Sequence, residues 1–217
     1  MKILLLGATG RTGKLLLSQA LDKGHEVHCL SRNIQRLPQH PQLTPFEGDP
    51  SKKGDLEKAI IGCQAILSVL NISRTSDFPW AKLRTPKLFL SDTMQQLLPL
   101  AKSHAVERVI ICSAWGVAET RKDIPGWFRW FIDNSNIGVA YQDHERQEAL
   151  LEASNLGWTI IRPVGLTNSK RAQSIRTTLY NQPKPSLTVS RLSVAKFILD
   201  SLKQADLIGK KVVISKA

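Results

Sequence analysis

Three glycines near the start of the chain stand three residues apart, in the run Gly7-Ala8-Thr9-Gly10-Arg11-Thr12-Gly13. In such a run the first glycine permits a tight turn, the second lets backbone approach a phosphate, and the third lets a helix pack on a strand. A helix that begins here offers free N–H groups and about half a positive charge to phosphate oxygens. The run is typical of a site for the pyrophosphate of a dinucleotide, and a structural turn without a ligand is the alternative.

The residues after the second predicted strand indicate which dinucleotide fits. A site that prefers NAD carries an acidic residue there, which accepts from the ribose 2′-hydroxyl. This chain has Ser31-Arg32-Asn33 instead, and Arg36 follows one helical turn after Arg32. Two charge-assisted hydrogen bonds to a 2′-phosphate contribute roughly 1.5–3 kcal/mol each. Together they favour the affinity for NADP(H) over that for NAD(H) by about two to four orders of magnitude. Arg11 can add to the same pocket. The alternative is that these arginines are merely solvated.

A carboxylate follows the third predicted strand, in Gly48-Asp49. A small residue and a carboxylate at this place can flank an adenine, whose amino group would donate to Asp49. A plain turn explains the same pair of residues.

Strands and helices alternate along nearly the whole chain. Apolar runs predict strands at residues 2–6, 26–30, 43–46, 65–70, 108–112, 159–162 and 211–215. Helical spacing predicts helices at residues 11–23, 55–61, 86–104, 139–154 and 191–204. Pro86 suits a first helical position, and Pro163 should stop the sixth strand. The order predicts an α/β fold of the Rossmann type, a doubly wound, mostly parallel sheet with helices on both faces, in a single domain over residues 1–217. Ligands of such sheets bind beyond the C-terminal ends of the strands.

Composition and charge exclude several classes. The 217 residues, 42% of them hydrophobic, are enough for one substantial core. No apolar stretch approaches the ~20 residues that span a membrane, and residues 1–6 are too short for a signal peptide. We therefore expect a cytoplasmic protein without a membrane partner. The three cysteines predict buried free thiols, and no cluster has the spacing of a metal site.

The net charge of +12 indicates an anionic ligand. Much of the excess follows Ile161, where eleven Lys and Arg residues face only Asp200 and Asp206. These charges are scattered, and no nucleic-acid-binding module is recognisable. A small anionic molecule is therefore favoured over nucleic acid as the partner.

Several stretches together resemble the atypical short-chain dehydrogenase/reductases. They are GATGRTG, SRNIQRLP at 31–38, Gly48-Asp49, Ser113, Asp143-His144-Glu145-Arg146 and the run from Trp158 to Pro163. Within that group the chain is similar to biliverdin-IXβ/flavin reductases and to NmrA-like NAD(P)-binding proteins. The resemblance implies that NADP(H) contacts Gly7, Thr9, Gly10, Arg11, Thr12, Gly13, Arg32, Arg36 and Asp49. It also implies that Leu70 lies near the cofactor and that Pro163, Val164 and Gly165 pass beside the nicotinamide.

The residues that would carry catalysis are fewer. Many short-chain dehydrogenases use a Tyr-x-x-x-Lys pair, but Glu145 stands four residues after Tyr141 and would raise the tyrosine pKa. Tyr141 is therefore expected to pack or to line a pocket. Ser113 ends the fifth predicted strand and could hydrogen-bond a substrate carbonyl or ring nitrogen. His144, at the matching place of the family, would lie near the nicotinamide and has an ordinary pKa near 6.5 that suits proton donation. A turn-capping serine and a packed histidine are the alternatives.

Two irregular segments, 71–85 and 115–138, are expected to cover the substrate. The second contains five aromatic residues, Trp115, Trp127, Phe128, Trp130 and Phe131. They could form a lid that stacks on a planar acceptor, close the core, or make a homodimer contact. The neighbouring basic side chains would suit a flavin phosphate or a tetrapyrrole propionate: Arg121, Lys122 and Arg129.

The sequence thus favours an NADP(H)-dependent oxidoreductase that passes hydride to a planar acceptor, such as a flavin, quinone or tetrapyrrole. The alternative is a non-catalytic NADP(H)-sensing regulator that binds a protein partner, as the NmrA-like resemblance implies. Isomerase or epimerase chemistry on a nucleotide sugar is a third reading. It is weakened by the missing tyrosine–lysine pair and by the short chain.

Overall fold

The computed structural model describes all 217 residues. Its central sheet has eight strands in the order β3-β2-β1-β4-β5-β6-β10-β8. All neighbours are parallel except β8, which pairs antiparallel with β10 at the sheet's edge. The strands are β1 (Lys2–Leu6), β2 (Glu26–Ser31), β3 (Leu43–Glu47), β4 (Ala65–Ser68), β5 (Arg108–Cys112), β6 (Trp158–Pro163), β8 (Ile175–Thr178) and β10 (Lys210–Lys216).

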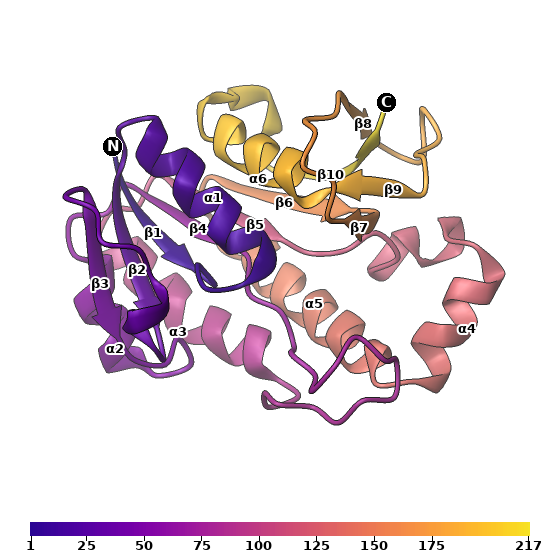
Figure 1. The fold of residues 1–217 in the computed structure, drawn as a ribbon, viewed down its shortest axis with the longest axis horizontal. Coiled ribbons are helices and arrows are strands. Elements are labelled where there is room, and N and C mark those ends of the chain that lie inside the picture. The colour runs from indigo at the N-terminus through magenta and orange to yellow at the C-terminus, as the bar shows by residue number, and fades with distance from the viewer.

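Helices cover both faces of this sheet, as Figure 1 shows. Helices α1 and α6 pack together on one face, while α2, α3 and α5 lie against the other. Their bounds are α1 (Arg11–Asp22), α2 (Lys53–Ile60), α3 (Phe89–Ser103), α5 (Ile137–Glu152) and α6 (Arg191–Asp200). The predicted doubly wound α/β architecture is therefore confirmed.

Strand β1 shows why its sequence is a continuous apolar run. Ile3 and Leu5 point into the core under α1 and α6, whereas Leu4 and Leu6 point into the core under α2, α3 and α5. A strand with both faces buried needs apolar side chains at every position.

Helix α3 begins later than the sequence predicted. It starts at Phe89, so Pro86 lies before the helix rather than at its first position. The Asp143 carboxylate on α5 accepts from the backbone N–H groups of Leu90 (2.6 Å) and Ser91 (3.3 Å). Asp143 thus satisfies two N–H groups that have no partner within the helix. A residue of another helix thus caps α3, and the sequence around residue 89 alone does not predict this start.

The segment 115–138 is more regular than expected. It contains a 3₁₀ helix, Ala118–Asp123, and helix α4 (Gly126–Asn134), which lies at the right of Figure 1. The sixth strand extends through Pro163, which is its last residue. The short strands β7 (Gly165–Thr167), β8 and β9 (Thr188–Ser190) were missed because they are polar and at most four residues long.

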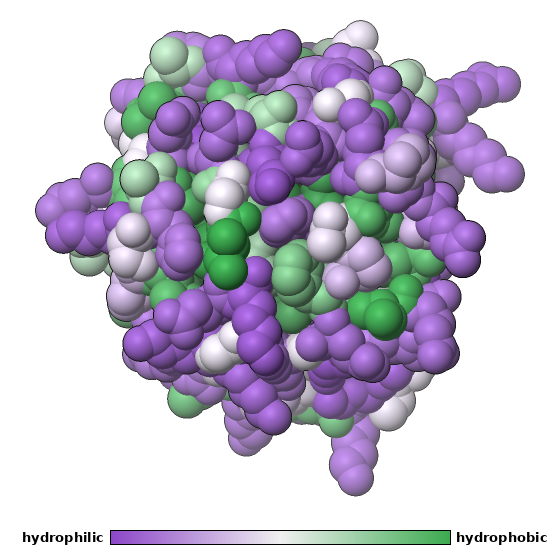
Figure 2. Space-filling model, turned by 90° about the vertical axis from the view of Figure 1, so that its left-hand side faces the viewer, coloured by the Kyte–Doolittle hydropathy of each residue, from purple (hydrophilic) through white to green (hydrophobic).

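The surface near β2 and β3 differs from that near α4. Figure 2 shows the surface near β2 and β3 as mostly hydrophilic, with small groups of apolar side chains between polar ones. Around α4, large aromatic side chains reach the surface instead, among them Trp127 at 63% exposure. None of the helices combines the length and apolar character needed to cross a bilayer.

Candidate functional site

A cavity of about 560 Å³ lies where β1, β2, β4 and β5 end. The glycine loop, the residues after β2, segment 71–85 and the end of β5 all contribute to its wall. This is the edge at which ligands of open parallel sheets bind. The sequence predicted these components separately, and the fold brings them to one cavity.

The glycine loop can close only because side chains are absent. Gly7 has φ +89°, and a Cβ there would lie 2.9 Å from the carbonyl of Val69 after β4. At Gly13 a Cβ would lie 2.0 Å from the carbonyl oxygen of Gly7. Gly10 donates its N–H to that same oxygen at 3.0 Å. Gly7 and Gly13 therefore have the roles that their spacing predicted, a positive-φ turn and close helix–strand packing, and the approach of a phosphate to Gly10 stays a prediction.

The N-terminus of α1 is free to bind an anion. No side chain caps it, and its first turn contains no acidic residue. The residues of this turn line the cavity, and its free N–H groups carry the positive end of the helix dipole. A dinucleotide pyrophosphate fits this cradle.

Arg32 and Arg36 both line the cavity, as predicted. Both are exposed, and neither makes an ion pair within the protein. Between them, Asn33 accepts from the Gln35 N–H and starts the 3₁₀ turn Ile34–Arg36. Ser31 hydrogen-bonds Asn33, so its hydroxyl is already used to shape this turn.

Other predicted contacts fall into two groups. Thr9, Thr12 and Leu70 lie in the cavity wall. Asp49, Pro163 and Val164 do not line it. Asp49 Oδ1 accepts from the N–H and hydroxyl of Ser51, a turn that the sequence had left open, and its contact with an adenine stays a prediction. Pro163 and Val164 are buried, and Leu166 is the residue after β6 that reaches the cavity.

Ser113 lies in the cavity wall with an unused hydroxyl. The residue is 6% exposed, and its Oγ has no partner at hydrogen-bonding geometry, although it lies near enough to the Glu148 carboxylate to lower the pKa of that group. A buried polar atom without a partner costs free energy unless a ligand satisfies it. The unsatisfied hydroxyl therefore supports the fit of a ligand at this end of the cavity.

His144 lines the same cavity but is not the titrating group that the sequence suggested. Burial lowers its pKa from 6.5 to about 4, so the expectation of an ordinary pKa is wrong. Its Nδ1 lies 2.7 Å from Nε2 of Gln147. Since an amide nitrogen donates, Nδ1 accepts and the imidazole proton stays on Nε2. At neutral pH, His144 is a neutral hydrogen-bond donor.

We expect the ring proton signals of His144 to stay constant between about pH 5 and 8. Burial disfavours the charged imidazolium, which places the titration at about pH 4. Proton NMR of the wild type beside a His144→Gln variant, used to assign the signals, measures this. A midpoint near pH 6.5 would contradict the burial of this ring.

Tyr141 is a packing residue, which is one of the two roles that the sequence predicted for it. It does not line the cavity, and its hydroxyl donates to the Trp115 carbonyl at 3.3 Å. Its ring meets Phe128 edge-on at 6.1 Å between centroids. Burial raises the pKa of Tyr141, so the phenol stays protonated.

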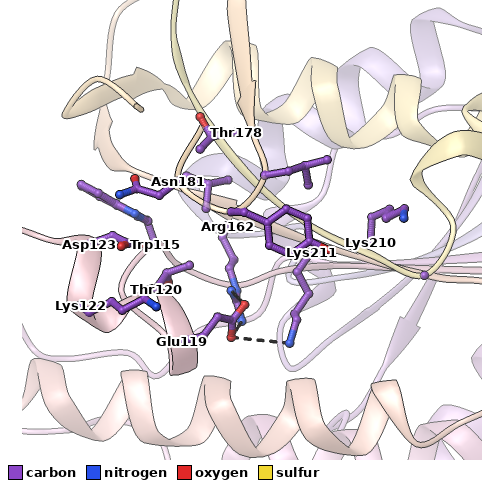
Figure 3. A pocket seen from close by; sticks show the side chains of 14 residues that line it. Trp115, Glu119, Thr120, Lys122, Asp123, Arg162, Thr178, Asn181, Lys210 and Lys211 are labelled. Atoms are coloured by element: carbon purple, nitrogen blue, oxygen red, sulfur yellow. Dashed lines mark hydrogen bonds and ion pairs between the residues drawn. The ribbon is translucent and has the colours of Figure 1, made fainter. Parts of the chain in front are cut away.

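A buried charged network behind Ser113 was not found from the sequence. Arg162, only 1% exposed, forms ion pairs with Glu148 and Glu119, and Lys211 lies 3.6 Å from Glu119. Figure 3 shows the side chains of Arg162 and Lys211 pointing toward Glu119, beside a separate cavity of about 310 Å³. Since Glu148 is on α5 and Arg162 on β6, only helix packing on the sheet joins them. Arg162 therefore holds α5 in place and is not part of the free positive charge.

The two segments expected to cover the substrate differ in position. Residues 71–74, 76, 77, 84 and 85 line the cavity. No residue of 115–138 does so. The tip of segment 71–85 instead contacts α4, since Trp80 donates to the Asn134 carbonyl and packs 5.8 Å from Phe131. Trp130 and Phe131 thus contact segment 71–85 from outside the cavity.

The fold and this cavity define a Rossmann-type dinucleotide-binding protein. A family described as NAD(P)H-binding matches residues 7–205 of the chain. The chain therefore belongs to the NAD(P)H-binding family, which confirms the class that the glycine loop indicated.

The curated relatives of this chain have varied descriptions. The photosystem II assembly factor Ycf39 of Trieres chinensis is 26% identical over 223 residues, covering 99% of this chain and 63% of that protein. Oxidoreductase aflX of Aspergillus parasiticus is 26% identical over 204 residues, covering 86% of this chain and 73% of that protein. The chain thus spans less than two thirds of the Ycf39 sequence.

Solved structures show the same fold. A short-chain dehydrogenase/reductase from Veillonella parvula, in complex with NADP, matches with a TM-score of 0.81 at 22% identity, covering 99% of this chain and 94% of that one. ChuY, an anaerobilin reductase from Escherichia coli O157:H7, matches with a TM-score of 0.80 at 18% identity, covering 100% and 97%. The predicted resemblance to short-chain dehydrogenase/reductases is confirmed at the level of the fold.

Proposed function

We propose that this protein is an NADP(H)-dependent oxidoreductase that passes hydride to a planar acceptor such as a flavin, quinone or tetrapyrrole. The observation that carries the proposal is the single cavity that joins Arg32 and Arg36 to Ser113 and His144. One end offers cations to a 2′-phosphate, and the other offers neutral hydrogen-bond donors to an acceptor.

The protein's own groups have distinct tasks in this proposal. Arg32 and Arg36 hold the 2′-phosphate, and the first turn of α1 holds the pyrophosphate. Hydride is the chemistry that bound NADPH supplies. Ser113 Oγ–H and His144 Nε2–H then donate hydrogen bonds to the oxygen or nitrogen of the acceptor that gains charge. Because His144 stays neutral, the acceptor takes its proton from solvent, and positioning provides most of the rate.

A turnover assay tests the proposal. Purified protein is mixed with NADPH and with FMN, riboflavin, quinones or biliverdin, and the nicotinamide absorbance is followed. Oxidation above the uncatalysed rate, lost in a Ser113→Ala/His144→Gln variant, supports the oxidoreductase. Tight NADPH binding without turnover of any acceptor would refute it.

We expect Arg32→Gln to weaken NADP(H) binding by about 10- to 100-fold and to leave NAD(H) binding unchanged. The variant removes one charge-assisted hydrogen bond to the 2′-phosphate, a group that NAD(H) lacks. Calorimetric titration with both dinucleotides measures the two affinities. Arg146→Gln, a change of an exposed arginine on α5 outside the cavity, is the matched control. Equal losses for the two dinucleotides would show that Arg32 does not recognise the 2′-phosphate.

The alternative is a non-catalytic NADP(H)-sensing regulator that binds a protein partner. The exposed aromatic side chains around α4 favour it, because Trp80, Trp127 and Trp130 are each more than 40% exposed. Aromatic residues dominate the energetics of protein interfaces. NADPH binding without turnover of any acceptor supports this alternative. If turnover is found, a Trp127→Ala/Trp130→Ala variant tests the aromatic surface: lost turnover supports a role in catalysis, whereas unchanged turnover excludes a lid that acts in catalysis.

A further inference from the structure

One carboxylate in the cavity wall attracts three arginines. Asp77, in segment 71–85, accepts two hydrogen bonds from Arg11, with Nη1–Oδ2 at 3.0 Å and Nη2–Oδ1 at 2.8 Å. Arg191 and Arg74 also act on this carboxyl and lower its pKa. All four side chains line the cavity. One negative charge among three positive charges leaves an excess of positive charge at this point.

Arg191 and Arg74 have no carboxylate of their own. Arg191 donates to the neutral oxygens of Asn168 (2.6 Å) and Leu166 (3.4 Å) and forms no ion pair. The Nε–H of Arg74 is buried and has no partner. A buried guanidinium N–H without an acceptor is unfavourable unless a ligand supplies one.

The position of these arginines sets them apart from Arg32 and Arg36. Arg191 is the first residue of α6 and holds the Leu166 carbonyl in β7, just after β6. Arg74 lies in segment 71–85, which follows β4. The strand order β2-β1-β4-β5 separates both residues from the end of β2. Arg191 is held beside the segment after β6, the strand next to β5 and Ser113, and both arginines also act on Asp77, the partner of Arg11.

We propose that Arg74 and Arg191 form an anion subsite for the acceptor, so that the preferred acceptor bears a carboxylate or a phosphate. Asp77 holds the place of that anion until the acceptor displaces it. The inference rests on the proposed function, since it names the substrate class of the same site. The displacement is inexpensive because the Arg11–Asp77 pair is largely exposed, and exposed ion pairs contribute little to stability.

FMN and riboflavin form the matched pair of probes, because they share one ring system and differ by a phosphate. Their affinities are measured by calorimetry with the protein saturated with NADP⁺. We expect wild type to bind FMN about tenfold more tightly than riboflavin. Arg191→Gln and Arg74→Gln should each remove most of that difference and leave riboflavin unchanged.

Asp77→Asn provides an independent variant, whose expected effect on FMN affinity is opposite to that of the arginine variants. Removing the internal carboxylate should tighten FMN binding several-fold and leave riboflavin unchanged. Asp133→Asn is the matched control, since Asp133 also pairs with an exposed arginine, Arg121, but lies outside the cavity. Asp133→Asn should change neither affinity.

Three outcomes would overturn the subsite. Wild type binding FMN no more tightly than riboflavin would show that no anion is recognised. Equal losses for both flavins in the arginine variants would show that these residues only support the fold. Weakened NADP⁺ binding with the flavin difference intact would assign the arginines to the cofactor's pyrophosphate. These binding results are separate from turnover: an intact FMN preference without NADPH oxidation refutes the oxidoreductase and leaves the subsite standing.

Discussion

Replacing Gly13 by alanine is expected to abolish NADP(H) binding, with a loss of about 100-fold or more in affinity. The added Cβ would lie 2.0 Å from the Gly7 carbonyl oxygen and 2.9 Å from the Ala8 Cα. Both are backbone atoms of the loop, so α1 must move away from β1 to relieve the contact. That movement displaces the N–H groups that bind the pyrophosphate and lowers the free energy of unfolding by about 3 kcal/mol. Calorimetry and urea denaturation measure the two effects.

Gly54 gives the matched control for this change. It lies near the start of α2, and a Cβ there meets no atom within 4 Å. Gly54→Ala should therefore raise the free energy of unfolding by about 0.5–1 kcal/mol, because alanine is the better helix former. NADP(H) affinity should not change. A Gly13→Ala protein that binds NADP(H) as wild type does would show that the loop is not the pyrophosphate site.

Replacing Arg162 by methionine is expected to lower the free energy of unfolding by about 3–5 kcal/mol. Arg162 and Glu148 are 1% and 2% exposed, and Arg162 Nε donates to Glu148 Oε1 at 3.1 Å. Without the guanidinium, the buried Glu148 carboxylate loses its direct ion pair and keeps only the weaker effects of Ser113 and Lys211. Arg121→Met, which breaks an exposed pair with Asp133, should cost only about 0–1 kcal/mol. Urea denaturation of both variants at neutral pH compares them.

The pH dependence of the Arg162→Met variant has a defined sign. Burial raises the pKa of Glu148, whereas Arg162 lowers it, so the variant retains mainly the effect of burial. A carboxyl whose folded pKa lies above its unfolded value gives full stability below the unfolded pKa, and that stability is lost as pH rises. Compared with wild type, the variant should therefore lose stability as pH rises above about 4, where an ordinary glutamate ionises, toward pH 7.

A double variant separates charge from packing. Arg162→Met/Glu148→Met removes both ions, and it should recover most of the lost stability because buried pairs are often replaceable by apolar side chains. No recovery would mean that the pair stabilises the fold through Glu119 and Lys211 as well, and the simple pairwise account would be wrong.

The features that depend on residues close together in the sequence could be predicted from the sequence alone. The spacing of the three glycines was enough to predict the loop, and the unbroken apolar run of β1 was enough to predict a strand buried on both faces. Arg32 and Arg36 come soon after β2, so the C-terminal end of this strand places them at the edge of the sheet where ligands bind. Residue types and spacing are sufficient for such features because the backbone geometry within one turn is nearly fixed.

The tertiary structure decided whatever depends on distant residues. Asp143 caps α3 across 53 residues, Glu148 pairs with Arg162 across 14, and Arg11 meets Asp77 across 66. The strand order and the packing of helices on the sheet bring these groups together, and neither is encoded in local spacing. For the same reason the pKa of His144 could not be read from its residue type: burial lowers it, and burial is a property of the whole fold.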